Sequence, residues 1–150
     1  MAHDIRNRSA VLPLLRYSAT AVAVGRVGLG VAALVSPSVP ARPWVGASAD
    51  ELGAQVFGRA LGARDLALGL GALAAAQAAS SGSWPAGARS AGAWYTAGAL
   101  SDALDVAVTV AAWPRLPRAT RWLVAASAGG AAVAGAAGAL ASFLEGRQAS

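Results

Sequence analysis

The amino-acid sequence predicts an all-α protein, a bundle of four transmembrane helices. Hydrophobic residues make up 56% of the 150-residue chain and charged residues only 13%, whereas soluble domains carry about 25% charged residues. Four apolar stretches each reach the roughly 20 residues that a membrane-spanning helix needs. Tryptophan and tyrosine lie near the ends of these stretches or between them, as in the aromatic belts of membrane interfaces.

The four expected spans are Tyr17–Val35, Phe57–Ala79, Gly92–Trp113 and Trp122–Leu144. They form one membrane domain over residues 17–144, with a polar segment at 1–16 before it and a polar tail at 145–150 after it. The aromatic residues that mark the interfaces are Tyr17, Trp44, Trp84, Trp94, Tyr95, Trp113 and Trp122. The alternative is a soluble, alanine-rich bundle with tryptophans in its core, but the fourth span contains no charged residue and would have no polar face.

Three linkers separate the expected spans: Ser36–Val56, Ser80–Ala91 and Pro114–Arg121. They contain six of the seven prolines, as expected of segments that interrupt helices. Ser48 and Glu51 have the spacing of a capping box, so we expect the second helix to begin near Ala49. Because Arg26 interrupts the first apolar stretch and further spans follow it, a cleaved signal peptide is not expected.

Four spans place both termini and the second linker on the same side of the membrane. The arginines expected on that side are Arg6, Arg8, Arg16, Arg89 and Arg147, and those on the other side are Arg42, Arg115, Arg118 and Arg121. Under the positive-inside rule, this excess of one arginine favours cytoplasmic termini for a protein of the cytoplasmic membrane.

Composition and motifs exclude several classes of function. The hydrophobic content excludes disorder, and the absence of cysteine excludes disulfides and cysteine–metal sites. The net charge is +5, but the arginines form no basic run, so nucleic acid is not an expected partner. The only histidine is His3, and Gly25–Gly30 is glycine-rich inside an apolar span rather than after a strand. We therefore expect neither an enzymatic activity nor a cofactor.

Charged residues inside the expected spans are the strongest functional signal, since each costs about 2.5–3.5 kcal/mol to insert unless it finds a partner. They are Arg26, Arg64, Asp65, Asp102 and Asp105. Asp65 and Asp105 both lie eight residues from the same membrane face, at a depth of about 12 Å. Arg26 lies at nearly that level and Asp102 one turn deeper. We expect one polar layer, with Arg26 facing Asp102 or Asp105 and Arg64 facing a neighbouring carboxylate.

Three interpretations of this layer stay open. It is a cluster of ion pairs that fixes helix register, a polar cavity for a proton, a small solute, a headgroup or an anion, or a set of snorkelling arginines without organisation. Arg59, near the end of its span, balances the layer at three arginines and three aspartates. Asp102 and Asp105 lie on one helix face and are able to share a proton if they are close and poorly solvated.

Small residues recur at helical spacing and predict close helix packing. The fourth span has such a ridge, made of Ala126, Gly130, Ala134, Gly138 and Ser142. The second and third spans share a pattern of small and polar residues: Gly58, Gly62, Asp65 and Gly69 in one, and Gly98, Asp102, Asp105 and Thr109 in the other. These faces favour contacts within the chain or between copies of it.

The segment Gly58–Gly69 (GRALGARDLALG), followed by Asp102-Ala103-Leu104-Asp105 and preceded by Gly25-Arg26, resembles a family of small bacterial integral membrane proteins. Members of that family have four predicted helices and no known function. More loosely, the chain is similar to DoxX-like four-helix membrane proteins. The resemblance covers residues 18–144 and implies a topology, with the buried arginines and aspartates as its polar signature, but it implies no activity.

Two hypotheses about function follow. The first is a structural or accessory membrane protein that contacts membrane lipids, alone, as a homo-oligomer or in a larger membrane complex. The second is a proton-coupled, small-solute or lipid-binding carrier that uses Asp102 and Asp105. A water-filled cavity that reaches these two carboxylates favours the carrier, and a dry, fully paired cluster favours the structural role.

Overall fold

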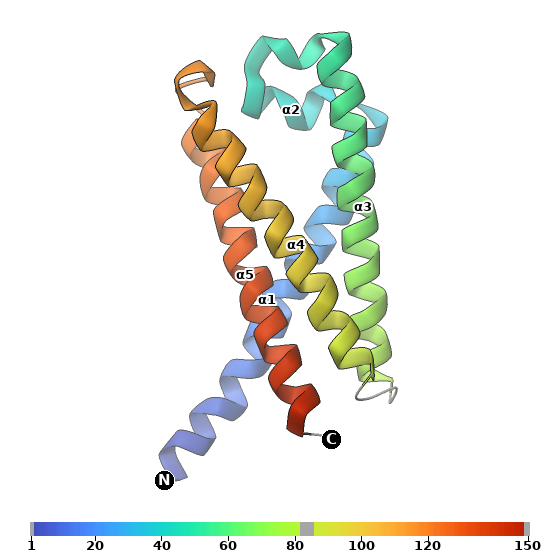
Figure 1. Ribbon diagram of the computed structural model, residues 1–150, viewed down its shortest axis with the longest axis vertical. Coiled ribbons are helices and arrows are strands. Elements are labelled where there is room, and N and C mark those ends of the chain that lie inside the picture. Colours follow the sequence, from blue (N-terminus) through green and yellow to red (C-terminus); the bar gives the residue numbers. More distant parts are fainter. Residues whose placement is uncertain (1, 82–85, 149–150) are drawn as a thin grey trace.

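The computed structural model describes residues 2–81 and 86–148, with side chains described for all of these except 2–11, 86, 88 and 148. Within these ranges the chain contains helices and turns but no strand, so the expected all-α class is confirmed (Figure 1). The elements are α1 (Ala2–Val35), α2 (Ser38–Val45), the 3-10 helix η1 (Gly46–Asp50), α3 (Leu52–Ser80), α4 (Ala86–Ala111), the 3-10 turn η2 (Trp113–Arg115) and α5 (Arg121–Gln148). Trp84 of the expected aromatic belt lies outside the described residues.

The four long helices alternate in direction along the length of the molecule (Figure 1). The largest helix contacts are those of α1 with α3 and of α4 with α5. The first and last described residues lie at the same end of the molecule, where α3 also ends and α4 begins (Figure 1). The opposite end carries α2, η1 and the connection between α4 and α5, so successive long helices are antiparallel.

The long helices extend beyond most ends of the expected spans, and α3 and α4 begin earlier, at Leu52 and Ala86. α1 already begins at Ala2, so residues 2–16 of the expected polar segment are helical. α4 ends at Ala111 rather than Trp113, because Pro114 disfavours helical backbone at the residue before it and a 3-10 turn begins there. α5 continues to Gln148, through most of the expected polar tail, and Glu145 is held by Arg16 at 3.3 Å.

The first linker is helical in most of its length, which the sequence analysis did not predict. The capping-box expectation for Ser48 and Glu51 is wrong, because η1 occupies this segment and α3 begins only at Leu52. Glu51 is the residue before α3, in an extended conformation, and no side chain caps the helix. At the end of α2, Gly46 adopts φ +68°, a left-handed conformation that glycine tolerates best, and its N–H bonds to the Arg42 carbonyl.

The end of the molecule that carries α2 is fastened by contacts between distant segments. The Thr120 hydroxyl donates a hydrogen bond to the Pro43 carbonyl and thereby joins the α4–α5 connection to α2. In that connection Trp113 and Trp122 pack edge to face with ring centroids 4.6 Å apart, and Arg121 lies over the Trp113 ring. α2 is therefore attached both to α1, which precedes it, and to the turn before α5.

Small side chains form the core, and large apolar side chains cover the outside. The core cluster contains Ala19 and Ala23 of α1, Ala72 and Ala75 of α3, Ala91 and Tyr95 of α4, and Ala139 of α5. In contrast, Phe57, Val108 and Val133, from three different helices, are 72%, 63% and 70% exposed. This distribution is the reverse of that in a soluble globule, where large apolar residues are the most often buried.

Alanine and glycine in the core allow α1 and α3 to approach at backbone distance. A Cβ atom at Gly30 would lie 2.7 Å from both the Gly62 carbonyl oxygen and the Leu66 amide nitrogen. Gly30→Ala is therefore expected to force the two helices apart and to lower the free energy of unfolding by about 1–3 kcal/mol. Gly28→Ala is the control, because no atom lies within 4 Å of its new methyl group. Thermal melting in detergent compares the two, and equal melting temperatures would contradict the close contact.

The ridge of small residues on α5 is used only in part. Gly138 and Ser142 are buried, and a Cβ atom at Gly138 would clash with Ala19 of α1. Gly130 and Ala126, nearer the start of α5, are exposed, and nothing lies within 4 Å of a Cβ built at Gly130. α5 thus packs on α1 through its C-terminal half and separates from it toward the end that carries α2 (Figure 1).

Candidate functional site

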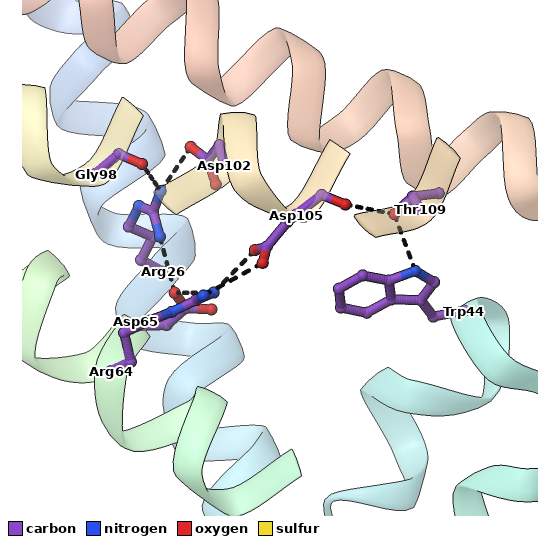
Figure 2. Close-up of polar contacts among 8 residues, drawn as sticks. All are labelled: Arg26, Trp44, Arg64, Asp65, Gly98, Asp102, Asp105 and Thr109. Carbon is purple, nitrogen blue, oxygen red and sulfur yellow. Dashed lines mark hydrogen bonds and ion pairs between the residues drawn. The ribbon is translucent and has the colours of Figure 1, made fainter. Parts of the chain in front are cut away.

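One guanidinium group joins three of the long helices. Arg26 of α1 places Nη1 2.8 Å from Asp65 Oδ1 of α3 and Nη2 2.5 Å from Asp102 Oδ2 of α4. Nη2 also donates a hydrogen bond of 2.7 Å to the carbonyl of Gly98, one turn before Asp102 (Figure 2). The Arg26 side chain is only 8% exposed. Because it is buried, its charge depends on these partners rather than on solvent.

A second guanidinium extends the cluster along α3 and α4. Arg64 donates from Nη1 and Nη2 to the two carboxylate oxygens of Asp105, at 3.2 and 2.8 Å. Its Nη2 also lies 3.2 Å from Asp65 Oδ1, the oxygen that Arg26 contacts. The result is a continuous chain of contacts, Asp102–Arg26–Asp65–Arg64–Asp105 (Figure 2). We call these five residues the Arg/Asp cluster.

The structure therefore brings together all five residues that the sequence analysis singled out, with different pairings. Arg26 contacts Asp102 but not Asp105, because Asp105 lies one turn further along α4 and is bound by Arg64. The contact of Arg26 with Asp65 was not expected. Arg59 is exposed and makes no ion pair among the described residues. The cluster thus contains three carboxylates and two guanidiniums, and the expected neutral balance of three and three is wrong.

Asp102 differs from the other two carboxylates in the way that Arg26 contacts it. Its Oδ2 is buried and lies close to Arg26 Nη2, yet it accepts no hydrogen bond within the described part of the chain, since Nη2 is aligned with the Gly98 carbonyl. Asp65 and Asp105, in contrast, accept aligned hydrogen bonds from Arg26 and Arg64. Asp102 is therefore in ion-pair contact with Arg26 but does not accept an aligned hydrogen bond from it.

α2 contacts the same region through an aromatic side chain. The Thr109 hydroxyl donates to the Asp105 carbonyl at 2.6 Å and accepts a hydrogen bond of 3.1 Å from the Trp44 indole N–H. Thr109 is 1% exposed, so its hydroxyl is shielded from solvent between α2 and α4. Figure 2 shows the indole extending from α2 toward the cluster. Sequence analysis assigned Trp44 to the membrane interface and did not anticipate this contact.

A groove of about 440 Å³ opens where α5 separates from α1. Arg26, Asp65, Asp102 and Asp105 line its inner part. Its apolar walls come from α1, α2 and the first half of α5, and they include Leu29, Pro40, Trp44, Leu123 and Val124. A second cavity of about 150 Å³, between α1, α2 and α3, is lined by some of the same residues, among them Trp44 and Asp65. Each carboxylate of the cluster thus has a guanidinium neighbour, and a cavity reaches the cluster.

The three carboxylates do not converge on one point. Within the described ranges, no three His, Cys, Asp or Glu side chains are arranged to hold a metal ion. What the arrangement offers chemically is a buried polar layer that carries one formal negative charge, next to apolar walls and an aromatic ring.

Comparison of the chain with protein-family models, with curated proteins and with solved structures found no match. The likeness to small four-helix bacterial membrane proteins therefore stays a prediction. The fold and the cluster define the described part of the chain as all-helical, with buried ion pairs between the helices.

Proposed function

We propose that this chain is a four-pass membrane protein in which the Arg/Asp cluster holds the helices in register, in a structural or accessory role. The contacts of Arg26 carry this proposal, because one guanidinium binds groups from α3 and α4. Buried polar groups of this kind fix register and packing more than they add net stability. Sliding any one of the three helices by one turn, about 5.4 Å, would break the network.

Two segments are long and apolar enough to cross a membrane, Leu12–Val35 of α1 and Arg121–Arg147 of α5. Only 28% and 17% of their most apolar windows are buried inside the protein, unlike the central helix of a soluble domain. Lipid accommodates such exposed apolar faces, and small residues in the interior are typical of membrane helix packing. These observations support placement in a membrane.

α3 and α4 complete the proposed bundle although their charges lower their hydropathy. With 29 and 26 residues they are about 44 and 39 Å long, more than the hydrocarbon core of about 30 Å. Asp65 and Arg64 of α3, and Asp102 and Asp105 of α4, face partners in the cluster rather than the outside. Charges in membrane helices are tolerated in this arrangement. Both termini then lie on one side, and we infer the cytoplasmic side of the cytoplasmic membrane.

Extraction tests the membrane placement. The protein is expected to stay in the membrane pellet after washes with high salt and with alkaline carbonate, and to dissolve only in detergent. The physical reason is the ring of exposed apolar side chains, which lipid or detergent has to cover. Recovery of a monodisperse, folded protein from detergent-free buffer would contradict the proposal.

A second candidate function is the binding or transport of a small solute. The groove that reaches Asp102 and Asp105 favours it, because ligand sites are typically clefts of about 300–1,000 Å³ with apolar walls and few polar groups. A purely structural cluster needs no such opening. The two roles are compatible, since a cluster that fixes helix register also holds the floor of the groove in place.

A further inference from the structure

We propose that the groove binds a lipophilic organic cation, with one positively charged nitrogen between the Arg/Asp cluster and the Trp44 ring and an apolar body along α5. This inference rests on the solute-binding candidate and goes beyond it by naming the charge and the shape of the occupant. It joins three independent observations, namely the charge of the cluster, the aromatic wall and the apolar volume beside them.

The charge of the cluster favours a single positive charge in the occupant. Three carboxylates face two guanidiniums, and Arg59 lies outside the network, so one formal negative charge is left. A buried charge without a partner is costly. Asp102 is 7% exposed and lines the groove, and it is the carboxylate without an aligned hydrogen bond. A monovalent cation in the groove would balance the excess negative charge of the cluster.

The walls favour an alkylated nitrogen over a metal ion. Trp44 lines both cavities, and its ring is positioned by the hydrogen bond from its N–H to Thr109. Indole rings attract organic cations through their π face, most strongly where water is excluded. Leu123 and Val124 of α5 supply an apolar surface opposite. Metal ions need several converging oxygen ligands, and the described carboxylates do not converge.

A proton on the cluster is the competing way to remove the excess charge. A protonated Asp102 would leave each guanidinium with one carboxylate, Arg26 with Asp65 and Arg64 with Asp105. The groove would then be electrically neutral and would not distinguish a cation from a neutral molecule of the same shape. The two cases therefore differ in ligand selectivity, which a binding experiment measures directly.

The test compares benzyltrimethylammonium with its neutral carbon isostere, neopentylbenzene, on the full chain in dodecyl maltoside at fixed ionic strength. Binding is followed by calorimetry and by ligand-dependent melting, in the wild type and in Asp102→Asn. This variant removes the excess charge and leaves every guanidinium a carboxylate partner. For each probe, the ratio of dissociation constants between the two proteins cancels partition into the micelle.

We expect Asp102→Asn to raise the dissociation constant of the cation about tenfold or more, because it removes a unit charge that lines the groove. The dissociation constant of the neutral probe should change by less than about twofold. Trp44→Leu lies outside the ion-pair network and should weaken the cation roughly 2- to 30-fold. It keeps the test decisive if Asp102→Asn folds poorly. Ser127→Trp, on the exposed α5 wall of the groove, should block both probes.

Equal ratios for the cation and the neutral probe, in both Asp102→Asn and Trp44→Leu, would overturn the proposal and assign the excess charge to a proton. Binding of neither probe, or binding that Ser127→Trp does not change, would also overturn it. If neither probe binds, or if Ser127→Trp does not change binding, the groove is not a solute-binding site. If the ratios are equal but Ser127→Trp blocks both probes, the groove still binds solutes, without selecting a cation.

Discussion

Replacement of Arg26 by leucine is expected to lower the free energy of unfolding by about 3–5 kcal/mol, the cost of breaking a buried ion pair from one side. Asp102 would lose its only cationic contact and Asp65 would keep only Arg64. Leucine fills a similar space, so the loss reports the missing charge rather than a cavity. Reversible unfolding of the purified protein in mixed detergent micelles measures the effect.

Arg59→Leu is the matched control for this variant. It makes the same chemical change in α3, but Arg59 is exposed and has no ion pair among the described residues. Surface substitutions of this kind usually change stability by less than about 0.5 kcal/mol. If Arg26→Leu were as stable as Arg59→Leu, Arg26 would not be the centre of the network.

The second large effect is expected for the pair Arg64 and Asp105. Arg64→Leu and Asp105→Leu should each destabilise the protein, and the double variant should recover much of the loss, because it removes both charges together. Residues in contact couple by about 0.5–3 kcal/mol, whereas distant residues add. The Arg64 side chain is 33% exposed against 8% for Arg26, so we expect smaller single effects than for Arg26→Leu. Unfolding free energies of the four proteins give the coupling.

Arg64 and Asp102 form the comparison pair for this cycle. Both belong to the cluster, but no ion pair joins them in the described structure. Their cycle should show a clearly smaller coupling than that of Arg64 with Asp105. Strictly additive effects for Arg64 and Asp105 would contradict the pairing along α3 and α4.

That the charged residues lie at one level of the bundle could be predicted from the sequence, but their pairing could not. Because successive spans are antiparallel, counting residues from their expected ends places Asp65 and Asp105 at one level. Which carboxylate meets which guanidinium depends on how each helix is rotated about its axis. That rotation follows from contacts such as Gly30 against Gly62, which bring α1 and α3 to backbone distance. A pattern of small residues indicates a close face but does not identify the facing helix.

α2 and the groove also could not be predicted from the sequence. Pro37, Pro40 and Pro43 favour an interruption of helical structure, yet Pro37 is the N-cap of α2 and Pro40 lies in its first turn, where no intrahelical N–H partner is needed. Pro43 lies inside this short helix, near its end. α2 therefore forms in a segment that reads as a loop. The groove exists because α5 contacts α1 through its C-terminal half, around Gly138 and at Glu145, although its small residues continue to Ala126. Which part of a uniform ridge is used depends on the crossing angle, which local sequence does not encode.

The proposed topology requires that α3 and α4 cross the membrane with the Arg/Asp cluster inside it. Labelling of single introduced cysteines tests this topology. The natural chain contains no cysteine, so each introduced thiol is unique. Ala47→Cys in η1 and Ala119→Cys in the α4–α5 connection lie at one end of the bundle, and Ser81→Cys lies just after α3 at the other. All three positions are exposed.

A membrane-impermeant maleimide is applied to right-side-out and to inside-out vesicles that contain each variant. We expect Ala47→Cys and Ala119→Cys to be labelled in the same vesicle orientation and Ser81→Cys only in the opposite one. Labelling of Ala47→Cys and Ser81→Cys from the same side would show that α3 does not cross the membrane. Labelling of Ser81→Cys and Ala119→Cys from the same side would show the same for α4, and either result would contradict a cluster buried within a four-pass bundle.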